Sequence, residues 1–274
     1  MYYLNQIKMG NSNSSKKNEK KEENEKKDEN EDENEKEFDE YYNELAKELK
    51  TNTDKIKKSV KKYKYNDELI VLIESGSLAP PHKMHIGLME ISKKYIEDNS
   101  NRKVVGGYLI PSSDSYVKQK LKDDFICLDH RVNMTKLCIK KSDWLECLDW
   151  GLAYGEEIKI LLQKVLNKTF PKYKNIKCML VFGIDYYIRN RIGFKDEHIC
   201  VFRPGYDIDL VKKLYPENLI CVEGKDEDIS STLIRKAIRE KNDKIINELT
   251  CEEIVDYIKN NDIFNNNIND KNKK

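Results

Sequence analysis

The stretch Leu69-Ile-Val-Leu-Ile-Glu-Ser-Gly76, continued by Ser77-Leu-Ala-Pro-Pro-His-Lys-Met-His85, decides the fold of this chain. Its opening run of apolar, largely β-branched residues predicts a strand that is buried on both faces, as in a parallel sheet. Pro80 and Pro81 exclude a helix from the residues that follow the strand. From His85 onward, apolar residues return at helical spacing. The stretch therefore predicts a strand, a glycine turn, an extended loop and a helix.

This arrangement places two imidazoles, His82 and His85, at the N-terminus of a helix and at the carboxyl end of a strand. Ligands bind at that edge of open α/β sheets, and helix amides favour anions there. The chain has only four histidines, and two of them lie three residues apart in this loop. We therefore interpret them as part of an anion-binding site and not as incidental surface residues.

A second segment, Ile229-Ser-Ser-Thr-Leu-Ile-Arg235, carries the residue types of another anion site. Ser230 or Ser231 is a suitable N-cap, so free amides and hydroxyls would again begin a helix. Arg235 lies about one turn later and can donate two hydrogen bonds to phosphate oxygens. Alone, the segment is typical of an ordinary capped helix, but its combination with the loop over 76–85 is specific.

Together the two segments resemble the signature motifs of the nucleotidylyltransferase superfamily, and their wording is closest to the eukaryotic type of mononucleotide adenylyltransferase. The resemblance covers roughly residues 68–264. Leu78 and Ala79 depart from the usual Phe and Asn or Asp, and His82 stands where that branch often carries Thr. The resemblance implies a Rossmann-like α/β fold, with a mostly parallel sheet and helices on both faces.

The resemblance also assigns residues to roles. It implies that three catalytic residues stabilise the charge of the phosphates: His85, His82 and Arg235. It implies ATP and phosphate binding by Gly76, Ser77, Lys118, Gly183, Asp185, Ser230, Ser231 and Thr232. Aromatic residues for the mononucleotide would be Tyr116, Trp150, Tyr154 and Phe194. Tyr116 and Lys118 would belong to a polar loop over residues 112–120.

The implied reaction is adenylyl transfer from ATP to nicotinamide or nicotinate mononucleotide, which gives NAD or deamido-NAD and pyrophosphate. Magnesium or another divalent cation would bridge the phosphates, held by substrate oxygens and water, with no protein ligand to the metal. Two alternatives stay open. One is another adenylyl- or cytidylyltransferase of the superfamily, such as pantetheine-phosphate adenylyltransferase, and the other is a non-catalytic nucleotide-binding scaffold.

The composition indicates which partners and which cellular compartment to expect. Lys and Arg number 50 against 49 Asp and Glu, so the charge balance does not favour nucleic acid as a partner. The seven cysteines form no C-x-x-C pair and indicate reduced thiols in a cytoplasmic or nuclear protein that is not secreted. The G-x-G-x-x-G and P-loop motifs are missing from the sequence. An oligomer is compatible with these features.

The ends of the chain differ in composition from its middle. Residues 16–37 contain only Lys, Asn, Glu and Asp, which predicts a disordered, charged tail over 1–65 with a possible short helix within 38–65. The nucleotidylyltransferase domain would span 66–264, and 265–274 would be disordered. Met9-Gly10 begins a match to the N-myristoylation pattern. If Met9 were the start, Gly10 would carry an acyl chain and give weak membrane association.

Overall fold

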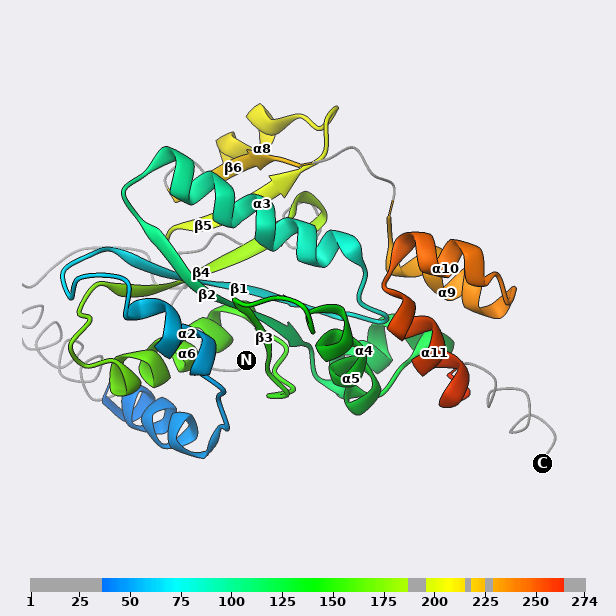
Figure 1. Ribbon diagram of the computed structural model, residues 1–274, viewed down its shortest axis with the longest axis horizontal. Helices are drawn as coiled ribbons and strands as arrows, with labels where there is room; N and C mark the ends of the chain where they lie inside the picture. The colour runs from blue at the N-terminus through cyan, green and yellow to red at the C-terminus, as the bar shows by residue number, and fades with distance from the viewer. Residues whose placement is uncertain (1–35, 187–195, 215–217, 225–228, 264–274) are drawn as a thin grey trace, which may run out of the picture. The chain divides into compact units, whose positions relative to one another are not determined.

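The computed structural model describes residues 36–186, 196–214, 218–224 and 229–263 (Figure 1). The chain divides into two compact units, 1–44 and 45–274. Residues 36–44 of the first unit are helical, and this helix continues to residue 48. The sheet and the candidate site belong to the second unit. The predicted acylation at Gly10 and the terminal segment over 265–274 lie outside the described residues.

A six-stranded sheet forms the centre of the second unit, and all of its strand pairs are parallel. The strand order is β3-β2-β1-β4-β5-β6. The first three strands therefore extend from β1 to one edge of the sheet, and the last three extend from β4, beside β1, to the other edge. This confirms the predicted Rossmann-like fold. The strands are β1 (Leu69–Gly76), β2 (Lys103–Pro111), β3 (Leu145–Cys147), β4 (Ile176–Gly183), β5 (His198–Phe202) and β6 (Leu219–Glu223).

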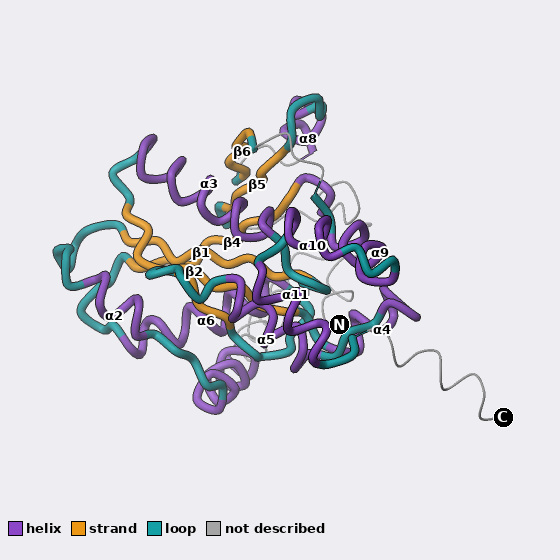
Figure 2. Tube along the Cα trace, turned by 45° about the vertical axis from the view of Figure 1, so that its right-hand side comes forward, coloured by secondary structure: helices purple, strands orange, loops and turns teal. Residues whose placement is uncertain are grey.

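Helices cover both faces of the sheet (Figures 1 and 2). On one face, α3 (Lys83–Asn99) and α5 (Leu128–Cys138) share an apolar cluster with the strands. On the other face lie α2 (Asp54–Val60) and α6 (Gly155–Thr169). The remaining helices are α4 (Asp114–Leu121), the short 3₁₀ turn η1 (Lys122–Asp124), α8 (Ile208–Leu214), α9 (Ser231–Arg239), α10 (Asp243–Leu249) and α11 (Glu252–Asn260). In the part of the chain that the structure describes, no helix is long and apolar enough to cross a bilayer.

The sheet opens where β1 and β4 part. The two strands pair from Leu69 with Ile176 to Ile73 with Leu180, whereas β1 continues beside β2 as far as Gly76. Beyond Ile73 the carboxyl ends of β1 and β4 therefore diverge. This is the topological switch point of the sheet, the position at which open α/β sheets bind ligands.

Close packing of α2 on the sheet depends on Gly106 in β2. A Cβ atom at this position would lie 2.4 Å from Cγ1 of Ile56, a buried residue of α2. Gly106→Ala should therefore push α2 from the sheet and lower the free energy of unfolding by about 1–3 kcal/mol, the usual cost of overpacking. Denaturant unfolding would measure this change.

Gly87→Ala is the matched control for Gly106→Ala. Gly87 lies within α3, where an added Cβ would come no closer than 3.9 Å to the side chain of Met84. Alanine is favoured over glycine inside a helix by about 0.5–1 kcal/mol, so this variant should be slightly stabilised. Equal stability losses in the two variants would contradict the packing argument.

Three sequence predictions differ from the structure. The polar loop predicted over 112–120 is mostly the helix α4, because Ser113 caps its N-terminus and Val117 is buried. The alternating pattern over residues 144–150 predicts a third strand as far as Trp150, but β3 ends at Cys147. The compact unit includes residues N-terminal to the predicted domain start at 66, since the lysine-rich segment before it buries Ile56 and Val60 in α2.

Candidate active site

A cavity of about 410 Å³ lies at the switch point of the sheet. Its wall includes the carboxyl ends of β1 and β4 and the N-termini of α3 and α9. Eleven of the residues predicted from the sequence line it: Gly76, Ser77, His82, His85, Tyr116, Gly183, Asp185, Ser230, Ser231, Thr232 and Arg235. The fold therefore brings together two segments that are about 150 residues apart in the chain.

The loop before α3 positions the two histidines against each other. Their rings stack with centroids 3.7 Å apart, and the backbone N–H of His82 donates to Nδ1 of His85 at 3.1 Å. This bond occupies the lone pair of Nδ1, so the neutral His85 ring carries its proton on Nε2. In the described part of the chain, Nδ1 of His82 is buried without a hydrogen-bond partner. The wall thus offers a ligand an N–H donor from His85 and an unsatisfied nitrogen from His82.

Both imidazoles are neutral near pH 7. Burial, and next the positive charge of Arg203, lower the pKa of His82 to about 4. Burial, and next the electrostatic interactions with His82 and Lys120, lower the pKa of His85 well below its usual value. Each ring can still donate a hydrogen bond to a phosphate oxygen without carrying a charge into the buried loop.

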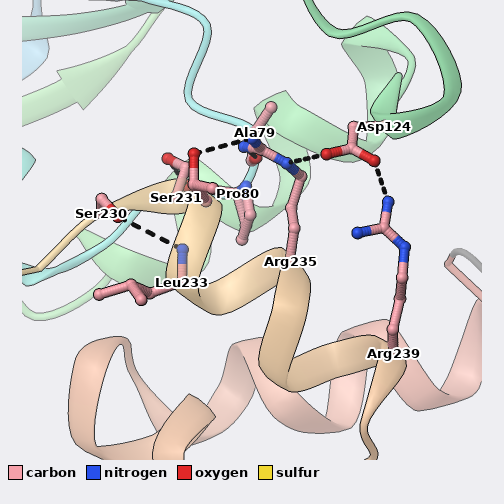
Figure 3. Close-up of polar contacts among 9 residues, drawn as sticks. Ala79, Pro80, Asp124, Ser230, Ser231, Leu233, Arg235 and Arg239 are labelled. Atoms are coloured by element: carbon pink, nitrogen blue, oxygen red, sulfur yellow. Dashed lines mark hydrogen bonds and ion pairs between the residues drawn. The ribbon is translucent and has the colours of Figure 1, made fainter.

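The N-terminus of α9 is fastened to the same loop. Ser230 caps the helix by accepting the N–H of Leu233 at 3.3 Å, and the hydroxyl of Ser231 donates to the carbonyl of Pro80 at 2.8 Å (Figure 3). The two helix N-termini therefore meet around one cavity, and both direct free amides towards it.

Arg235 is held more firmly than the sequence predicted. Its guanidinium is buried and donates to the carboxylate of Asp124 at 2.9 Å, the carbonyl of Ala79 at 2.9 Å and the hydroxyl of Thr232 at 3.0 Å (Figure 3). These contacts use three of its five N–H groups. Arg235 therefore joins α9 to the proline loop, residues 77–82 between β1 and α3. Its two remaining N–H groups can bind a ligand in the cavity that Arg235 lines.

A second buried arginine shapes the glycine turn. Arg131 is fully buried in α5 and donates to the carbonyl of Ser77 at 3.0 Å, the carbonyl of Ile126 at 2.8 Å and the carboxylate of Asp114 at 2.8 Å. Through these bonds one side chain fixes the turn after β1 relative to the start of α4.

Some predicted residues lie elsewhere. Lys118 is exposed and does not line this cavity, whereas Lys120 does, and its ammonium donates to the hydroxyl of Ser77 at 3.0 Å. The reason is helical geometry: positions 116 and 120 share one face of α4, and position 118 points away from it. The placement of Lys118 beside Tyr116 in a loop was wrong.

Two of the predicted aromatic residues do not line the cavity either. Trp150 is buried, and its indole N–H donates to the carbonyl of Lys50 at 3.2 Å, so the ring packs within the fold. Tyr154 forms the N-cap of α6 and is 49% exposed. Phe194 lies outside the described residues. A ring clamp for the mononucleotide built from these residues is therefore still a prediction.

One acidic residue in the cavity wall, Glu74, was not predicted from the sequence. Glu74 follows Ile73 where β1 and β4 part; it is 5% exposed, and its Oε2 lacks a hydrogen-bond partner among the described residues. The only available signal was a carboxylate at the end of an apolar strand. Arg203 and Lys120, which also line the cavity, were likewise missed.

Burial raises the pKa of Glu74 to about 8. The unfolded chain loses this proton near pH 4.3, so between that pH and about 8 the folded state binds more protons and its stability falls as pH rises. Glu74→Gln cannot ionise. We expect wild type to lose roughly 3–5 kcal/mol relative to this variant between pH 4.5 and 8.

Denaturant unfolding across that pH range would measure the difference. Glu68→Gln is the control, because it makes the same chemical change at an exposed residue just before β1. Parallel stability curves for wild type and Glu74→Gln would contradict the assignment of a neutral, buried carboxyl.

An open parallel sheet with a cavity at its switch point, bordered by two helix N-termini, is typical of a nucleotide-binding α/β protein. The chain belongs to the cytidylyltransferase-like family, whose sequence model matches residues 74–237. That match spans both motifs, and it confirms the superfamily resemblance drawn from them.

Within this superfamily, the chain is similar to curated mononucleotide adenylyltransferases. The chain is 25% identical over 221 residues to the nicotinamide/nicotinic acid mononucleotide adenylyltransferase of Arabidopsis thaliana, which covers 71% of this chain and 90% of the relative. It is 25% identical over 225 residues to nicotinamide/nicotinic acid mononucleotide adenylyltransferase 2 of Caenorhabditis elegans, covering 71% and 97%.

A solved structure shares the fold. The Plasmodium falciparum nicotinic acid mononucleotide adenylyltransferase complexed with APC superposes with a TM-score of 0.50 at 16% identity, covering 72% of this chain and 97% of that one.

Proposed function

We propose that this protein transfers the adenylyl group of ATP to nicotinamide mononucleotide, nicotinate mononucleotide or both, releasing pyrophosphate and forming NAD or deamido-NAD. One observation carries the proposal: the helix N-termini of both motifs meet at one cavity, tied by the bond from Ser231 to Pro80. The names of the curated relatives support this choice of acceptor.

The chemistry needs positioning more than proton transfer. A phosphate oxygen of the mononucleotide attacks the α-phosphorus of ATP, the new P–O bond forms, and the bond to the β-phosphate oxygen breaks. The attacking oxygen is already anionic, so a general base is unnecessary. Negative charge grows on the leaving pyrophosphate, and fixed N–H donors stabilise it best. We assign His85, the amides of the α3 and α9 N-termini and the two remaining N–H groups of Arg235 to this role.

The opposite wall suits the nucleoside part of ATP. Gly183 ends β4, and a Cβ atom there would meet nothing within 4 Å, so the cavity is open beside its backbone. Asp185 lies in the short helical segment that follows, over residues 184–186, and lines the same cavity. We propose that its carboxylate accepts hydrogen bonds from ribose hydroxyls.

We propose that magnesium enters on the triphosphate. The hard oxygens of Ser77, Ser230 and Asp185 on the cavity wall fit a hydrated ion of this kind, whereas the two buried imidazoles do not. When bound, the ion would offset phosphate charge.

Turnover assays test the proposal and its rivals. Purified protein is given ATP or CTP with nicotinamide mononucleotide, nicotinate mononucleotide or phosphopantetheine, and pyrophosphate release and product mass are measured. We expect turnover with ATP and a pyridine mononucleotide. Turnover only with another pair would assign a different transferase of the superfamily. Binding of ATP without any turnover would identify a scaffold.

A further inference from the structure

Two cysteines from distant parts of the chain face each other beside the candidate site. Cys138 ends α5, and Cys251 is the N-cap of α11. Their Sγ atoms lie 3.7 Å apart, both residues are half-buried, and neither forms a disulfide. Of the other cysteines, Cys147, Cys178 and Cys200 are buried, and Cys127 and Cys221 are half-buried.

The pair also contacts Thr250, the residue that connects the start of α11 to the proline loop. Sγ of Cys138 lies 3.8 Å from the hydroxyl of Thr250, the residue before Cys251. That hydroxyl is buried and donates to the carbonyl of Pro81 at 3.1 Å. Pro81 directly precedes His82. A short chain of contacts therefore connects the two sulfurs to the histidine pair.

We propose that Cys138 and Cys251 form an oxidisable dithiol site. Hydrogen peroxide converts the pair into an intramolecular disulfide, and this disulfide alters the proline loop through Thr250 and Pro81. The disulfide is independent of the proposed function. Its effect on turnover rests on that function.

The geometry fits stepwise oxidation. The hydrogen bond that Cys251 shares with Cys138, followed by the bond from the backbone N–H of Ile254, lowers the pKa of Cys251, while the same pairing and burial raise the pKa of Cys138. Cys251 is thus the more nucleophilic sulfur, as expected for a thiol at a helix N-terminus.

The chemistry balances without a further reactant. The Cys251 thiolate attacks one peroxide oxygen, the O–O bond breaks, and hydroxide leaves as water after protonation, which gives a sulfenic acid. Cys138 then loses its proton and attacks the Cys251 sulfur, so the S–S bond forms, the S–O bond breaks and a second water leaves. Two thiols lose two electrons, and peroxide is reduced to two waters.

Closure of the disulfide must move the loop contact. An S–S bond is about 2 Å long, so the sulfurs have to approach from 3.7 Å. Thr250 is adjacent to one of them and buried, so it moves with the sulfur and its bond to Pro81 is displaced. We expect the Michaelis constant for ATP to rise roughly fivefold or more, the lower range of coupling between sites.

Peptide mapping tests the site itself. The full chain is treated with hydrogen peroxide, the remaining thiols are blocked and the protein is digested with trypsin. Cleavage after lysine gives the fragments 137–140 and 245–259, each with one cysteine. We expect these two fragments to be joined, with the loss of two hydrogen atoms, and to separate after reduction with dithiothreitol. Sulfinic acid at Cys251 without the cross-link would overturn the site.

Kinetics test the coupling. Cys138→Ser and Cys251→Ser should keep basal activity and lose sensitivity to peroxide, whereas Cys127→Ser, at the half-buried N-cap of α5, should keep that sensitivity. Dithiothreitol should restore the Michaelis constant of wild type. A cross-link that leaves this constant unchanged would overturn the coupling to Pro81 while leaving the proposed reaction intact.

Discussion

Replacement of His85 by alanine is expected to lower kcat for adenylyl transfer by about a hundredfold to a thousandfold, the usual cost of removing one fixed donor from a developing charge. The ring is neutral and carries its proton on Nε2, since Nδ1 accepts the N–H of His82. The variant loses this donor together with the cap-like contact, so a modest stability loss of about 0.5–2 kcal/mol should accompany the kinetic effect. Steady-state kinetics and thermal unfolding measure the two separately.

A pair of amide substitutions separates the donor from the cap. The side-chain amide of His85→Gln can reach the position of Nε2, whereas that of His85→Asn reaches only the position of Nδ1. We expect glutamine to recover part of the lost activity and asparagine to recover part of the stability. Equal activity in the two variants would show that the cap contact, and not the donor, matters for turnover.

The sequence predicted the fold best where local signals agree. The apolar run of β1, the glycine turn and the prolines before α3 all indicate one arrangement, and the structure confirms it. Ser230 predicted the start of α9 for the same reason, because its hydroxyl caps the helix. The α4 helix was missed because its polar residues resemble a loop, and only Val117 reveals a buried face.

The sequence predicted many of the residues that line the cavity, but not the contacts between them. The sequence predicted Arg235 as a site residue, but the partners of Arg235 and of the second buried arginine, Arg131, come from positions that no local pattern connects. Arg235 bonds Ala79, which lies 156 residues away, and Arg131 bonds Ser77, which lies 54 residues away. Glu74 was missed for a related reason: its burial depends on where β1 leaves β4, which only the strand register defines.

Arg235→Lys is expected to raise the Michaelis constant for ATP more than that for the mononucleotide and to lower the free energy of unfolding by about 3–5 kcal/mol. Lysine keeps the charge, but a single ammonium cannot reproduce the separate bonds to Asp124, Ala79 and Thr232 while also serving a phosphate. The free energy of unfolding falls because the buried hydrogen bonds between α9 and the proline loop are broken and Asp124 loses a buried partner.

Arg239→Lys is the matched control for this variant. Arg239 pairs with the other oxygen of Asp124, but its side chain is 46% exposed, and it is not among the residues that line the cavity. The same substitution there should change stability by less than about 1 kcal/mol and leave the Michaelis constant for ATP unchanged. If Arg235→Lys loses stability without any change in that constant, Arg235 only fastens α9 to the loop. In that case the amides of the α3 and α9 N-termini and His85 would be left to hold the leaving pyrophosphate.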